Sequence, residues 1–155
     1  MRRAAKKQRA GATLARATVM ELSSRESAPV GLVTWRVIDG KGRGVVTTRA
    51  CTAGTEVERA PVVILPKRDI LLRGGEMTVL EEYLLYWSDE PERELAMGGG
   101  LLMFYNHSAR PNVQFDTGSD GHSMSVTTLR DVASGEELLY DYGVPLWFTP
   151  APDDR

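Results

Sequence analysis

The sequence predicts one mainly β domain with only short helices. Its apolar residues gather in short runs rich in valine, isoleucine and threonine, a composition typical of strands. Turns containing glycine separate these runs, and only one stretch spaces its apolar residues three and four apart, as a helix does. A chain of 155 residues is long enough to bury a core without a disulfide or a metal. The sequence shows no internal repeat and no second domain.

The first two strands are predicted to form a hairpin. Leu32 to Ile38 is apolar and β-branched, Gly40 to Gly44 supplies a turn, and Val45 to Thr48 resumes the strand pattern. A third strand is expected over Pro61 to Pro66, where four apolar residues lie between two prolines.

One amphipathic helix is expected over Val79 to Trp87. Its apolar residues recur at helical spacing, and Thr78 followed by Glu81 has the pattern of a capping box. The C-terminal half then returns to strands, which are separated by turns containing glycine. The strand-like segments there are Val113 to Phe115, Met124 to Leu129 and Leu138 to Tyr142.

Charge divides the chain into a basic leader and an acidic body. Residues 1–20 hold six basic residues and no acidic one, so the rest of the chain carries a net charge of -8. We predict a disordered basic tail over residues 1–27, although a transit peptide or an arm that contacts nucleic acid would carry the same charge. The folded domain is expected over residues 28–148, followed by a frayed tail over residues 149–155. The acidic body favours a basic protein as partner and disfavours nucleic acid, except at the leader.

Composition excludes several classes of protein. The single cysteine, Cys51, cannot form an internal disulfide or a cysteine-rich zinc cluster. The two histidines lie far apart in the sequence, so no metal site is predicted. No run of about 18 apolar residues occurs, which excludes a membrane-spanning helix. We expect an intracellular protein, cytoplasmic in most sources and nuclear in a eukaryotic or viral one.

Three local patterns are candidates for chemistry, and each also has a structural explanation. The glycines of GKGRG at residues 40–44 either let the backbone approach a ligand or form a hairpin turn without one. His107, beside Asn106, is either a structural histidine or a ligand contact. Tyr140 and Tyr142 should face the same side of a strand, either as packing residues or as part of a site.

Other polar residues are weaker candidates. The adjacent Glu136 and Glu137 are expected to be solvated beside a turn and not to form an acid–base pair. Nothing in the sequence places Cys51 or Ser108 beside a base, so neither is predicted to be a nucleophile. On the residues alone, the sequence indicates a β-rich domain with an acidic body.

Three motifs taken together are similar to a known family. GKGRG at residues 40–44, NHSARPN at 106–112 and GEELLYDYG at 135–143 resemble, in order and spacing, the SET domain of protein lysine methyltransferases. The resemblance covers Val33 to Phe148. It implies several small twisted β-sheets and a C-terminal segment that passes beneath a loop to form a knot-like core. Residues 106–112 and 138–143 should then lie against each other.

The resemblance also implies a cofactor, S-adenosyl-L-methionine, and a lysine substrate bound on the opposite face. The glycine motif would hold the cofactor through its backbone, and NHSARPN would hold the amino-acid and adenine parts. The implied cofactor-binding residues are Gly42, Arg43, Gly44, Asn106, His107 and Trp147.

For catalysis, the resemblance implies a role for two tyrosines. Tyr142 matches the family's catalytic tyrosine, and Tyr140 occupies the position that influences how many methyl groups are added. A phenol there takes up room that a methylated amine would need, so mainly monomethylation is expected. Tyr83 and Phe115 are candidates for the lysine channel, although both are also explained as buried packing residues.

The sequence lacks the cysteine-rich zinc segments that flank larger family members, so it resembles the minimal viral or bacterial type. The site would then be closed by Val144 to Phe148 or by a second subunit, which makes a homodimer one expectation. The expected substrate is a lysine in a histone or another basic protein. Two alternatives stay open: an inactive binding module with the same fold, and a regulatory protein whose basic tail does the work.

Overall fold

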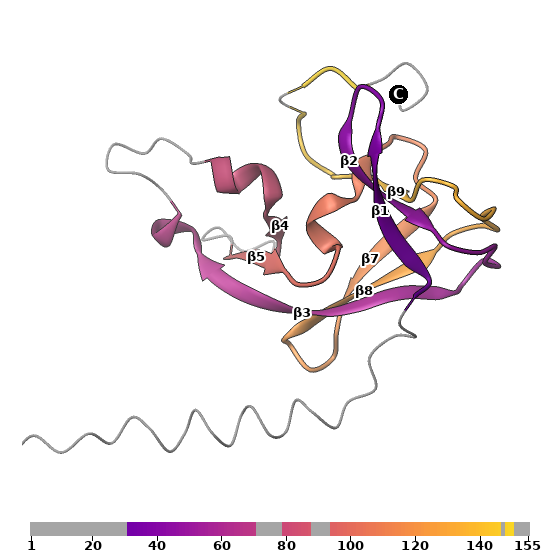
Figure 1. Cartoon of the computed structure of the whole chain (residues 1–155). Coiled ribbons are helices and arrows are strands. Elements are labelled where there is room, and N and C mark those ends of the chain that lie inside the picture. The colour runs from indigo at the N-terminus through magenta and orange to yellow at the C-terminus, as the bar shows by residue number, and fades with distance from the viewer. Residues whose placement is uncertain (1–30, 71–78, 88–93, 147, 151–155) are drawn as a thin grey trace, which may run out of the picture.

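The computed structural model of the protein describes residues 31–70, 79–87, 94–146 and 148–150. Within these ranges the chain forms three sheets and three short 3-10 helices, so the prediction of a mainly β fold is confirmed (Figure 1). The five-stranded sheet is antiparallel throughout, in the order β4 (Leu85–Tyr86), β5 (Glu94–Gly98), β3 (Glu56–Pro66), β8 (Ser123–Thr128) and β7 (Val113–Thr117). None of the described helices has the length and apolar character needed to cross a membrane.

The predicted hairpin is confirmed. β1 (Val33–Ile38) pairs antiparallel with β2 (Gly42–Thr47), and the Lys41 N–H closes the turn on the Ile38 carbonyl at 3.2 Å. Gly40 and Gly42 adopt φ values of 72° and 81°, a region that favours glycine. The turn is shorter than the predicted Gly40 to Gly44, because β2 already begins at Gly42. A turn here is compatible with both interpretations of the glycine run.

β3 is longer than predicted and changes partner along its length. Its first half pairs with β8 and its second half with β5, so it links both sides of the sheet (Figure 1). Pro61 was expected to begin the strand but lies inside it. The ladder with β5 starts at Val62, and the Pro61 carbonyl extends it by accepting the Gly99 N–H at 2.8 Å.

The predicted amphipathic helix over Val79 to Trp87 is wrong beyond its first turn. A 3-10 helix, η3 (Val79–Tyr83), is followed directly by β4, and the Trp87 N–H donates to the Glu94 carbonyl at 3.0 Å. Backbone pairing of β4 with β5 overrides the helical spacing of the apolar residues. The expected capping residue, Thr78, lies outside the described residues.

Two segments distant in the sequence pair in parallel beside the hairpin. β6 (Asn106–His107) lies along β9 (Leu139–Tyr140), with Asn106 opposite Leu139 and His107 opposite Tyr140. The Ser108 N–H donates to the Tyr140 carbonyl at 3.1 Å. The motifs NHSARPN and GEELLYDYG thus lie against each other, as the resemblance implied.

The core lies between the five-stranded sheet, the hairpin and η4 (Leu102–Phe104). A 3-10 helix, η2 (Lys67–Asp69), follows β3. The core's most deeply buried apolar residues, each exposed by 2% or less, are Val45, Val46, Val57, Ala96, Leu102, Tyr105, Val113, Val126 and Leu138.

Candidate active site

The candidate site begins at the glycine motif, where β2 passes close to β6. Gly44 is buried, and a Cβ built on it would lie 2.7 Å from Glu137 Oε1 and 2.8 Å from Asn106 Nδ2. The same Cβ would lie 2.6 Å from Ile38 Cγ1, so a larger residue must displace this side chain as well as both polar groups. Glycine at this position therefore lets the hairpin backbone touch the polar residues of β6 and of the segment before β9.

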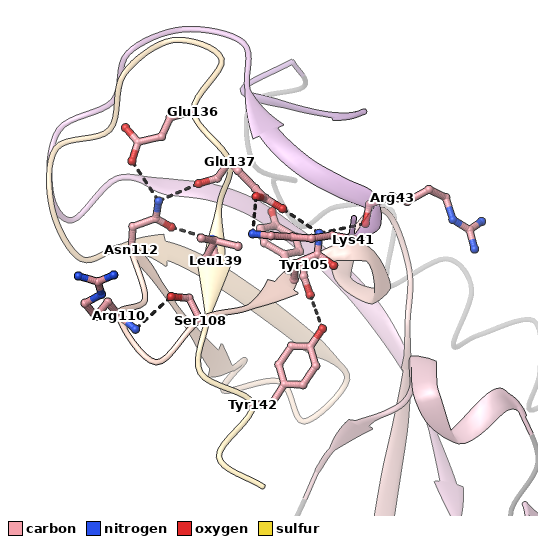
Figure 2. Close-up of polar contacts among 11 residues, drawn as sticks. Lys41, Arg43, Tyr105, Ser108, Arg110, Asn112, Glu136, Glu137, Leu139 and Tyr142 are labelled. Atoms are coloured by element: carbon pink, nitrogen blue, oxygen red, sulfur yellow. Dashed lines mark hydrogen bonds and ion pairs between the residues drawn. The ribbon is translucent and has the colours of Figure 1, made fainter. Parts of the chain in front are cut away.

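Asn106 is the centre of this polar contact. Its Nδ2 donates to the Arg43 carbonyl at 3.2 Å and to Glu137 Oε1 at 2.8 Å. The other carboxylate oxygen of Glu137 accepts from Lys41 Nζ at 3.0 Å, an ion pair shown in Figure 2. Both amide hydrogens of Asn106 are thereby used, so Oδ1 is its atom left to accept a hydrogen bond from a ligand.

The Arg43 side chain points away from this polar cluster, toward Phe104 and Tyr83. Its guanidinium carbon lies 4.7 Å from the centre of the Phe104 ring, and Nη2 donates to the Tyr83 hydroxyl at 3.3 Å. The structure thus places Tyr83 beside the glycine motif. Among the described ring contacts, none joins Tyr83 to Phe115, the other residue predicted for the lysine channel.

His107 is held by the backbone of the last motif. Its side chain is 8% exposed, and its Nδ1 accepts the Tyr142 N–H at 3.2 Å. A ring nitrogen that accepts a hydrogen bond carries no proton, so the proton of a neutral His107 is on Nε2. This residue can therefore offer one ring N–H to a ligand.

Tyr142 has a fixed hydroxyl. It donates to the Tyr105 carbonyl at 3.0 Å, as Figure 2 shows, and its ring centre lies 5.1 Å from that of His107. Burial, together with the negative charge of Glu137, raises the pKa of Tyr142 to about 12. The phenol therefore keeps its proton at neutral pH and does not act there as a base.

A row of aromatic rings continues from Tyr142. Tyr140 lies next to it at 4.8 Å between ring centres and stacks on Phe115 at 4.3 Å, with 15° between the planes. Phe115 in turn meets Tyr105 edge-on at 5.2 Å. Burial raises the pKa of Tyr140, so this hydroxyl is also protonated at neutral pH. The row joins four aromatic rings, and its side chains carry three phenol hydroxyls, of Tyr105, Tyr140 and Tyr142.

The sequence model of the SET domain family matches residues 42–143. The chain belongs to the SET domain family. Over 113 residues this SET domain is 37% identical to a Schizosaccharomyces pombe protein named histone-lysine N-methyltransferase, H3 lysine-37 specific, covering 73% of this chain and 74% of that protein.

A solved structure supports the fold. The SET domain superimposes with a TM-score of 0.56 on a Plasmodium falciparum crystal structure provisionally named a histone methyltransferase. The two are 20% identical, and the match covers 74% of this chain and 99% of that one. The predicted SET-domain fold and the predicted enzyme class, protein-lysine N-methyltransferase, are thus confirmed.

The SET domain brings most of the predicted residues together. Asn106 meets the glycine motif, and the N–H of Tyr142, two residues after β9, donates to His107 on β6. Phe115 joins Tyr140 and not Tyr83. Tyr140 and Tyr142 are neighbours although β9 ends at Tyr140, so strand alternation was not the reason for their proximity. Trp147 lies outside the described residues.

Sequence reasoning missed several residues of the site. Glu137 was expected to be solvated, yet it is 16% exposed and links Lys41 to Asn106. Tyr105, which the sequence did not single out, supplies the carbonyl that accepts the Tyr142 hydroxyl. Phe148, the last residue of the segment expected to close the site, places its ring 6.5 Å from that of His107. Glu137 lies inside the nine-residue motif, which was the available signal. The described residues contain no group of three acidic, histidine or cysteine side chains close enough to bind a metal ion.

Proposed function

We propose that this SET domain transfers a methyl group from S-adenosyl-L-methionine to the side-chain amine of a lysine in a basic protein, and that it adds mainly one methyl group. The observation that carries the proposal is the convergence of Asn106, His107 and Tyr142 at the β6–β9 pair, next to the glycine motif. Family membership and the lysine methyltransferase relative support the reaction class.

The polar groups around Gly44 suit the cofactor. S-adenosyl-L-methionine supplies an electrophilic methyl group and presents an amino acid at one end and adenine at the other. Asn106 Oδ1 can accept a hydrogen bond from an ammonium group, and the His107 ring N–H can donate one. The partly exposed Glu137 carboxylate beside Asn106 contributes negative potential that favours a cationic ligand.

The aromatic row suits the lysine. A lysine side chain has a pKa near 10.4 in water and must lose its proton before the amine can act as a nucleophile. Phe115, Tyr140 and Tyr142 offer an environment with few polar atoms, which disfavours the ammonium form. The Tyr142 hydroxyl donates a hydrogen bond to the Tyr105 carbonyl, which fixes the direction of the phenol oxygen beside the amine. These residues align and desolvate the amine without a general base.

Two features point to a histone or a similarly basic protein as substrate. The relative's name gives histone H3 lysine 37 as its target, and the chain beyond residue 20 has a net charge of -8, which attracts basic segments. A histone substrate would require the protein to reach chromatin.

The test is transfer of labelled methyl groups to purified histones and whole-cell proteins, comparing the native chain with Tyr142→Phe. We expect labelling by the native chain and a loss of about 100-fold or more in the variant, because the hydroxyl that orients the amine is gone. Tyr86→Phe, which removes the hydroxyl of an exposed tyrosine on β4, is the matched control and should label like the native chain. Equal labelling by native chain and Tyr142→Phe would refute the assigned role, and no cofactor binding at all would refute the function.

A further inference from the structure

Glu58 is a buried carboxylate outside all three family motifs. It lies on β3 with 8% of its surface exposed. One oxygen accepts the Leu101 N–H at 2.6 Å, and the other accepts the Tyr105 hydroxyl at 2.8 Å. Burial raises the pKa of Glu58, and both hydrogen bonds counteract this by stabilising the charged form. The carboxylate is thus held between two donors, in the core and away from the polar cluster of the glycine motif.

The run Gly98 to Gly100 makes this contact feasible. A Cβ on Gly100 would collide with the Glu58 carboxylate, and a Cβ on Gly99 would lie 2.9 Å from the Pro61 carbonyl. Gly100 also has a φ of 58°, which favours glycine. The chain can therefore pass close to β3 only because these residues lack side chains, and it delivers Leu101 and Tyr105 to the carboxylate.

Tyr105 connects Glu58 to the reacting centre. Its hydroxyl is bound to Glu58, its carbonyl accepts the Tyr142 hydroxyl, and its ring packs edge-on against Phe115. Tyr105 is 2% exposed, so its position depends on contacts within the protein and not on water. A shift of Tyr105 would move both the acceptor for Tyr142 and the ring on which Phe115 rests.

We propose that Glu58 is a positioning residue for methyl transfer. Its carboxylate holds the Tyr105 hydroxyl; Tyr105 in turn orients the hydroxyl of Tyr142 through its carbonyl and supports the Phe115–Tyr140 stack through its ring. This inference rests on the proposed function for its kinetic consequence. The link between Glu58 and Tyr142 can also be measured without any reaction, so the two proposals can fail separately.

The kinetic test compares Glu58→Gln with Glu56→Gln. Glu56 is on the same strand and forms an ion pair with Arg59 at the surface, so its substitution controls for the loss of a carboxylate from β3. An amide at position 58 cannot accept both hydrogen bonds in their present form. We expect kcat to fall about tenfold or more in Glu58→Gln, with the KM for S-adenosyl-L-methionine unchanged, because alignment and not cofactor binding is disturbed. Glu56→Gln should match the native chain.

A double substitution tests whether Glu58 acts through Tyr105. Glu58→Gln and Tyr105→Phe should each lower kcat by a similar factor, and the double variant should be no slower than either single one. If the two losses multiply, Glu58 does not act through the Tyr105 hydroxyl and the proposal is overturned. Should Glu58→Gln fail to fold, Tyr105→Phe alone must still lower kcat, and an unchanged kcat there overturns the proposal.

The second readout is a ¹³C NMR spectrum of the protein labelled at the Cζ carbon of its five tyrosines. Single Tyr→Phe substitutions assign the resonances. Glu58→Gln should move the Tyr105 and Tyr142 resonances and leave that of Tyr86 unchanged, and Glu56→Gln should move none of these. A Tyr142 resonance that stays in place overturns the positioning role. Shifted resonances in a protein that methylates no substrate would instead support the link and refute the proposed function.

Discussion

Gly44 shows how one missing side chain can shape a binding site. A Cβ there would overlap the space now taken by the Asn106 amide and the Glu137 carboxylate. Gly44→Ala should therefore weaken binding of S-adenosyl-L-methionine by about tenfold or more, roughly 1.4 kcal/mol, as measured by calorimetry. The residue's φ is not in the region that favours glycine, so the effect comes from the contact and not from backbone strain.

Gly121→Ala is the control for this substitution. Gly121 has a φ of 69° and no atom within 4 Å of its built Cβ, so alanine there strains the backbone without entering any site. We expect it to lower the free energy of unfolding by about 1 kcal/mol and to leave cofactor binding unchanged. Native-like binding by Gly44→Ala would show that the polar cluster tolerates the displacement and is not the cofactor site.

We propose that Tyr140 limits the space beside Tyr142. Its ring is sandwiched between Phe115 and Tyr142, and its hydroxyl adds volume and a polar atom at that point. Tyr140→Phe should raise the share of dimethyl and trimethyl product several-fold while monomethyl product is still formed, because the phenylalanine ring keeps the stack. Mass spectrometry of the modified peptide measures the distribution, and the same distribution in variant and native chain would contradict the volume argument.

At the scale of the elements, Asn112 joins the two motifs. It is 2% exposed; its Nδ2 donates to the Glu137 carbonyl at 2.8 Å, and its Oδ1 accepts the Leu139 N–H at 2.7 Å (Figure 2). Asn112→Ala leaves both backbone groups without these partners and should lower the free energy of unfolding by roughly 2–4 kcal/mol. Chemical denaturation measures the change.

Gln114→Ala is the matched control for Asn112→Ala. Gln114 is an exposed amide on the neighbouring strand β7, bound only to the Asp116 side chain at 3.0 Å among its described side-chain contacts. Its loss should change the unfolding free energy by less than about 0.5 kcal/mol. If Asn112→Ala proves equally mild, the β6–β9 pair does not depend on this side chain.

The elements also show what the sequence could and could not predict. The β1–β2 hairpin depends on residues next to each other in the chain, so Gly40 and its flanking strands predicted it correctly. The helix expected over Val79 to Trp87 failed because β4 is stabilised by pairing with β5, a contact that the local spacing does not encode. Strand boundaries near Pro61 failed for the same reason.

The candidate site also contains residues that the sequence could predict and residues that it could not. Motifs held Asn106, His107 and Tyr142, so a resemblance could assign them without knowing their contacts. Glu58 and Tyr105 are 47 positions apart and belong to no motif, and only the folded chain brings them together. Partners of this kind need the tertiary structure, because neither residue type nor spacing singles them out.

At the scale of the whole molecule, charge should select the substrate. Beyond residue 20 the chain has a net charge of -8, and the exposed acids Asp116 and Asp141 adjoin Phe115 and Tyr142 in the sequence. Raising the salt concentration from about 0.1 M to about 1 M shortens the Debye length from about 10 Å to about 3 Å and screens this attraction. The KM for a lysine peptide with basic flanks should rise about tenfold or more, whereas the KM for the same lysine between neutral flanks should change little. Parallel assays with both peptides measure this, and a chain lacking residues 1–20 should show at least as large a salt effect because it loses only positive charge. Equal salt effects on the two peptides would mean that recognition rests on the shape of the site and not on the acidic body.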